Sequence, residues 1–157
     1  MTQQELHGLL GQYRAGLEAE VSLLRQLEGV AARQRDVSES RDYDRLTAAN
    51  DERDRLTRTL VTIDQGLRAV RTRLSASRAE VADMPDFTIV AELRRSAADL
   101  VARILATDRD SMKALADADL ARRAAVASLE RGENTLAAYR KVIAPPVSSA
   151  TLLNRRG

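Results

Sequence analysis

Apolar residues recur every three or four positions along most of this 157-residue chain. The longest regular run alternates steps of three and four from Leu46 to Val81. Because a 3.5-residue repeat keeps one helix face against its neighbours, this run indicates a coiled-coil-like helix with these side chains as its seam. The predicted helix covers about residues 42–82 and is ~60 Å long at ~1.5 Å per residue. Other long helices must cover such a seam. Its positions are Leu46, Ala49, Arg53, Leu56, Leu60, Ile63, Leu67, Val70, Leu74, Ser77 and Val81.

A second run of this kind predicts a helix over about residues 3–36. Additional apolar residues beside its seam, such as Leu9 and Val30, widen the stripe. A wide stripe indicates a helix that contacts more than one neighbour. The seam residues share one heptad frame and are Leu6, Leu10, Tyr13, Leu17, Leu24 and Leu27.

The connection between these two helices, DVSESRD, contains no Gly or Pro, so one continuous helix over residues 3–82 is an alternative. The two seams are one residue out of frame, and on a continuous helix this offset would rotate the apolar stripe by ~100°. Ser38 or Ser40 could cap a new helix, with Asp42 and Asp44 in its first turn. These features favour a turn near residues 36–42.

The next boundary lies in DMPDFTI, where Pro85 follows a helix and Asp86 or Thr88 could cap the next one. The third helix is predicted over about residues 89–143, with a stutter in its seam after Ser111. Residues 144–157 begin with two prolines and are expected to form a flexible C-terminal tail. The prediction is therefore an all-α protein, with a single helical-bundle domain over residues 1–143. Its architecture would be an elongated antiparallel three-helix bundle or coiled coil.

The predicted third helix is about fifteen residues longer than the second at the same rise per residue. Its end, with Leu136, Tyr139, Val142 and Ile143, should therefore extend past the second helix. Apolar side chains without a partner in their own chain imply a partner elsewhere. That partner would be a client helix or a second copy of this protein.

The amino-acid composition argues against several classes of function. Hydrophobic residues make up 44% of the chain but aromatic residues only 3%, so the core must consist of Leu, Val, Ile and Ala. The 25 basic and 23 acidic residues leave a net charge of only +2, and aromatic stacking platforms are missing, which argues against nucleic-acid binding. No uncharged stretch approaches the ~18 apolar residues of a membrane span. We expect a cytoplasmic protein that does not insert into membranes.

Candidate chemistry is sparse. The only histidine, His7, lies near the N-terminus, and the chain has no cysteine. Carboxylates two positions apart, such as Asp117 and Asp119, point in different directions on a helix and cannot chelate one ion together. We expect no catalytic residue, no cofactor and no metal, and hence no enzyme. Arg53 interrupts the second seam, and it either reaches a carboxylate such as Glu20 or Glu52 or lies in solvent at the hairpin end.

Several segments together resemble the FlgN/FliT-type flagellar export chaperones. These are the Leu-rich EAEVSLLRQLEGVAARQ, the acidic connection DVSESRDYDRL, the charged entry NDERDRLTRTLVTID, and an AAY segment before a tail that ends in RRG. The resemblance covers most of the chain as a pattern of helices. Many coiled coils share such a pattern, so a generic helical adaptor remains the alternative.

The resemblance implies a bacterial chaperone that binds the C-terminal helices of flagellar hook-associated proteins at the hook-filament junction. It would keep them monomeric and deliver them to components of the type III export gate. The client-binding residues that it implies are Leu129, Leu136, Tyr139, Val142 and Ile143. The alternative is a structural or adaptor coiled coil that forms a homodimer through its exposed seam.

Overall fold

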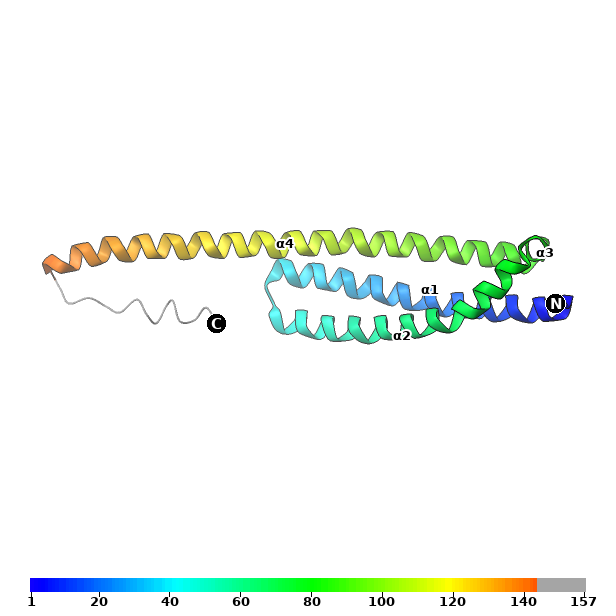
Figure 1. Ribbon diagram of the computed structural model, residues 1–157. Coiled ribbons are helices and arrows are strands. Elements are labelled where there is room, and N and C mark those ends of the chain that lie inside the picture. Colours follow the sequence, from blue (N-terminus) through cyan, green and yellow to red (C-terminus); the bar gives the residue numbers. More distant parts are fainter. Residues whose placement is uncertain (144–157) are drawn as a thin grey trace. The chain divides into compact units, whose positions relative to one another are not determined.

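All elements are helices in the described part of the computed structural model, which covers the backbone of residues 1–143 and the side chains of residues 1–132 (Figure 1). They are α1 (Gln3–Ser40), α2 (Tyr43–Ala76), α3 (Arg78–Ala82) and α4 (Asp86–Ile143). The predicted all-α fold is thus confirmed. The chain divides after Ala114 into two units, so the single bundle domain expected over residues 1–143 stays a prediction. The tail predicted for residues 144–157 lies outside the described residues.

The helix α1 begins with a capping box. In this motif the side chains of the N-cap residue and of the residue three positions later each accept a hydrogen bond from the backbone N–H of the other residue. The Thr2 hydroxyl accepts from the Glu5 backbone N–H at 3.2 Å, and the Glu5 carboxylate accepts from the Thr2 N–H at 2.7 Å. This backbone hydrogen bond lowers the pKa of Glu5. The cap satisfies N–H groups that the first turn would otherwise leave without partners.

The chain turns between α1 and α2, as the frame offset predicted, but later than expected. Arg41 adopts a left-handed conformation with φ 59°, which ends α1 after Ser40. Asp42 then caps α2 by accepting from the Arg45 N–H at 3.2 Å. The proposed caps Ser38 and Ser40 were wrong, since both lie inside α1 and bond backbone carbonyls of that helix.

The helix predicted over residues 42–82 is interrupted at Ser77, which has φ −116° and ψ 36°. The Ser77 N–H donates to the Leu74 carbonyl at 3.1 Å, a tight final turn, and the short α3 follows. The interruption was missed because Ser77 and Val81 keep the seam spacing. Val81 of α3 is still buried, in the same cluster as α1 and α2 residues.

The core of the first unit, Met1–Ala114, consists of two clusters that show how its helices run. Early α1 residues share the first cluster with late α2 residues, whereas late α1 residues share the second cluster with early α2 residues, so the two helices are antiparallel (Figure 1). Val90 belongs to the first cluster and Ile104 to the second, so α4 runs parallel to α1 in this unit. The largest side chains with almost no exposure are Leu6, Leu10 and Val30.

Candidate functional site

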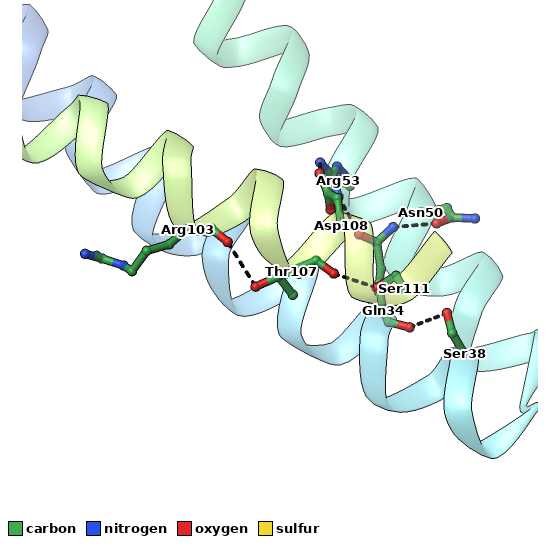
Figure 2. Close-up of polar contacts among 8 residues, drawn as sticks. All are labelled: Gln34, Ser38, Asn50, Arg53, Arg103, Thr107, Asp108 and Ser111. Atoms are coloured by element: carbon green, nitrogen blue, oxygen red, sulfur yellow. Dashed lines mark hydrogen bonds and ion pairs between the residues drawn. The ribbon is translucent and has the colours of Figure 1, made fainter. Parts of the chain in front are cut away.

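A layer of polar side chains occupies the seam of the first unit near the α1–α2 turn (Figure 2). The Arg53 guanidinium donates two hydrogen bonds to the Asp108 carboxylate, at 2.6 and 2.7 Å, and one to the Gln34 amide oxygen at 2.7 Å. Gln34 in turn donates to the Asn50 side-chain oxygen at 2.6 Å. We call Gln34, Asn50, Arg53 and Asp108 the polar layer; it joins α1, α2 and α4.

The polar layer decides between the two interpretations of Arg53. Its side chain is 28% exposed and that of Asp108 24%, so the pair lies within the bundle and not at a solvated hairpin end. The carboxylate is Asp108, whereas Glu52 pairs with Arg33 at 2.9 Å. The hydrogen bond to Asp108 raises the pKa of Arg53. Bidentate geometry makes this a structural pair that holds one register of α2 against α4.

A groove runs between α2 and α4 in the first unit, and α1 forms its floor. It consists of three hollows of about 370, 190 and 420 Å³. The first and second hollows share Tyr13, Arg71 and Arg94, and the second and third share Glu20 and Ala97. Because neighbouring hollows share lining residues, they form one continuous feature, which we call the α2/α4 groove.

Apolar side chains line the floor of the α2/α4 groove along its length. Leu10, Leu17 and Leu24 of α1 lie along its floor. At one end Val61 and Val101, which are 48% and 42% exposed, line its two walls. At the other end lies Phe87, which is 37% exposed. An apolar trough with exposed walls is suited to the apolar face of another helix.

Charged side chains interrupt this lining. Arg71 donates to the Asp64 carboxylate at 2.7 Å, and this bond raises the pKa of Arg71. Glu20 lines two of the hollows but forms no hydrogen bond or ion pair with any residue of the described chain. Burial raises the pKa of Glu20, and the nearby Asp64 carboxylate adds to this effect.

The client-binding residues implied by the family resemblance lie in the second unit, from Leu115 onward. Among them only Leu129 has a described side chain, and it is 56% exposed on α4. Leu136, Tyr139, Val142 and Ile143 lie outside the residues whose side chains are described. From Leu115 to Gly132 no side chain of α4 is buried, and Leu120 is exposed like Leu129.

The described residues give little support for a metal site or a membrane-spanning segment. No three His, Cys, Asp or Glu side chains among them gather closely enough to hold a metal ion, and His7 is exposed on α1. None of the helices searched in this part of the chain combines the length and apolarity of a membrane span.

The α2/α4 groove was not predicted from the sequence, although two signals point towards it. Glu20 occupies the seam position between Leu17 and Leu24, where an apolar residue would be expected. Val61 and Val101 each follow a seam residue and add apolar surface beside the seam. Both signals are common in helical proteins, so the groove becomes visible only when the three helices are placed together.

Comparison of the chain with protein-family models, with curated proteins and with solved structures finds no match in any of the three.

Proposed function

We propose that this protein is a non-enzymatic chaperone or adaptor that binds an amphipathic helix of another protein. The observation that carries the proposal is the α2/α4 groove, a trough along three helices with apolar residues on its floor and walls. A fourth helix laid in this trough would cover Val61 and Val101 and complete a four-helix arrangement.

The resemblance to FlgN/FliT-type chaperones suggests the identity of the partner. We propose that the client is the C-terminal helical segment of a flagellar hook-associated protein, which this cytoplasmic chaperone keeps monomeric and delivers to the type III export gate. Covering an amphipathic helix prevents it from associating with other copies of itself, so the proposed binding mode suits this task. Leu129 and the residues predicted beyond it are the alternative contact for this client.

The test is a measurement of molar mass by size-exclusion chromatography with light scattering, with and without a C-terminal fragment of a hook-filament junction protein. A monomer that shifts to a one-to-one complex supports the chaperone proposal. The double variant Val61→Glu/Val101→Glu should weaken binding if the groove holds the client, and Leu136→Glu/Tyr139→Glu should weaken it if the end of α4 does. Lack of binding by the unmodified protein would refute the flagellar assignment.

Self-association is the second candidate function. Its specific support is the exposure of Leu120 and Leu129 on a stretch of α4 where no described side chain is buried. Two such stretches from two copies could bury these residues against each other as a coiled coil. A dimer that ignores the junction-protein fragment and dissociates in the Leu120→Glu/Leu129→Glu variant would favour this adaptor function.

A further inference from the structure

The charges of the α2/α4 groove are unevenly distributed along its length. The hollow nearest α3 is lined by three guanidinium groups, from Arg71, Arg78 and Arg94, and by no carboxylate. The central hollow contains Glu20 together with Arg71 and Arg94. The third hollow contains Glu20, Asp64 and Arg68. The groove therefore has a positive end near α3, and its carboxylates lie from the middle towards the other end.

Several of these charges are not neutralised within the described part of the chain. Arg71 pairs with Asp64, but no ion pair or hydrogen bond there involves Arg78, Arg94 or Glu20. When a partner binds over a charged group, that group loses its hydrating water. The loss costs free energy unless the partner supplies an opposite charge. A helix entering this groove must therefore match its pattern of charges as well as its apolar lining.

The spacing of the groove charges sets the spacing required of a partner. Tyr13 lies two helical turns, or ~10 Å, from Glu20 on α1, and it lines both the central hollow and the hollow that contains Arg78. Seven residues of a partner helix cover the same rise. On α4 the groove extends from Phe87 to Val101, so a partner helix of about four turns or more would span it.

From this arrangement we infer that the α2/α4 groove selects an amphipathic partner helix with a basic side chain opposite Glu20 and an acidic side chain, about seven positions away, in the hollow that Arg78 and Arg94 line. The inference rests on the proposed helix-binding function and specifies its partner. Charge complementarity of this kind determines which helix binds and in which register.

Three synthetic helical peptides of 18 residues, binding to the full-length protein, test the inference by fluorescence anisotropy. All three have the same Leu/Ala face. The mixed peptide has Lys and Glu seven positions apart, the acidic peptide has Glu at both positions, and the neutral peptide has Gln at both. The protein should bind the mixed peptide about tenfold more tightly than the acidic one. The acidic peptide loses the pair with Glu20, which contributes up to ~1 kcal/mol, and it places a like charge against Glu20, so that the difference approaches the 1.4 kcal/mol that corresponds to tenfold.

Variants assign the preference to individual residues. Glu20→Lys should reverse it, so that the acidic peptide binds more tightly than the mixed one. Arg94→Glu should weaken binding of the mixed peptide by about fivefold, as expected for the loss of one such pair. Arg95→Glu is the matched control, because Arg95 is the exposed neighbour of Arg94 and does not line the groove, and it should leave the affinity unchanged. Circular dichroism confirms that each variant remains helical.

Equal affinity of the unmodified protein for the mixed and acidic peptides overturns the charge inference while helix binding stands. Lack of binding by all three peptides also overturns it, and the junction-protein titration then decides the proposed function separately. If light scattering finds a homodimer that Glu20→Lys or Arg94→Glu converts to a monomer, the groove holds a second copy of the chain, and the inferred partner is wrong.

Discussion

Two charged residues occupy seam positions in the first unit, and the fold treats them differently. Arg53 belongs to the polar layer, where Asp108 and Gln34 supply three hydrogen bonds from the same chain. Glu20 lies in the α2/α4 groove and has no such partner among the described residues. A charge in a heptad seam is therefore not by itself a sign of binding. Only a seam charge that the chain leaves without a partner indicates a surface for another molecule.

The groove region should depend for its stability on the apolar floor beneath it. Leu10 is 1% exposed and lines the groove near Phe87. Replacing Leu10 with Ala removes buried methyl groups and leaves a cavity, so the free energy of unfolding should fall by about 3 kcal/mol. Urea titration followed by circular dichroism measures this loss. Leu129→Ala, at an exposed position, should change the free energy of unfolding by less than about 0.5 kcal/mol. Equal effects of the two substitutions would contradict the burial of Leu10.

The polar layer should be sensitive to the removal of one partner and tolerant of the removal of both. Asp108→Ala leaves the Arg53 guanidinium partly buried without its carboxylate, so it should lower the free energy of unfolding by about 1–3 kcal/mol. The double variant Arg53→Met/Asp108→Leu replaces the pair with apolar side chains and should recover most of this loss. A double-mutant cycle of urea unfolding energies measures the coupling. Additive effects would mean that the two residues act independently.

Packing between α1 and α2 beside the groove can be tested with two glycines of α1. A Cβ added at Gly16 would lie 2.5 Å from two methyl carbons of Leu67, whereas one at Gly11 would meet nothing within 4 Å. Gly11→Ala should raise the free energy of unfolding by up to ~1 kcal/mol, through better helix propensity. Gly16→Ala should lower it by about 1 kcal/mol, because the displacement of Leu67 outweighs that gain. Stabilisation by both substitutions would mean that α1 and α2 are less closely packed at Gly16.

The smallest expected effect concerns the pH dependence of Glu20. Its pKa is raised above the ordinary 4.5, so the folded state holds the proton more tightly than the unfolded state. The resulting stabilisation is complete below pH 4.5 and is lost as the pH rises through the folded pKa. Asp64 adds to the upward shift and Arg71 opposes it.

Glu20→Gln removes this titration, so the stability of the variant relative to the unmodified protein should increase as the pH rises from 4 towards 7. Thermal unfolding at several pH values measures the difference. A constant difference between the Glu20→Gln variant and the unmodified protein would mean that Glu20 is as well solvated in the fold as in the unfolded chain.

Much of the fold could be predicted from the spacing of apolar residues. Leu56, Leu67, Val70 and Leu74 were assigned to the seam of the second helix, and all are buried. Ala49 and Val81 at the two ends of that seam are buried as well. The break at Ser77 was not predicted, since the seam continues through it with unchanged spacing. The spacing of apolar residues indicates which side of a segment faces the core. The same spacing can continue through a break, so it does not show that the segment is one straight helix.

Less of the candidate site could be predicted. Arg53 was recognised as an exception in the seam, but its partner Asp108 lies 55 positions away on another helix and could not be paired with it by local spacing. The groove was missed altogether. Of the implied client-binding residues, Leu129 is exposed as a binding residue would be, and the role of all five stays a prediction.

Local sequence was sufficient to predict the helical class, the buried faces and a turn between the first two long helices, because helix periodicity involves residues only a few positions apart. The exact cap of α2 and the break at Ser77 were not predicted. The pairing of Arg53 with Asp108, the absence of a hydrogen bond or ion pair to Glu20 among the described residues, and the opening of the groove depend on the folded bundle. Each depends on the distance between α2 and α4, and α1 sets that distance by packing against both. A heptad pattern predicts that a helix packs against neighbouring helices. Whether those neighbours pack tightly together or leave a groove for another helix depends on the tertiary packing of their side chains.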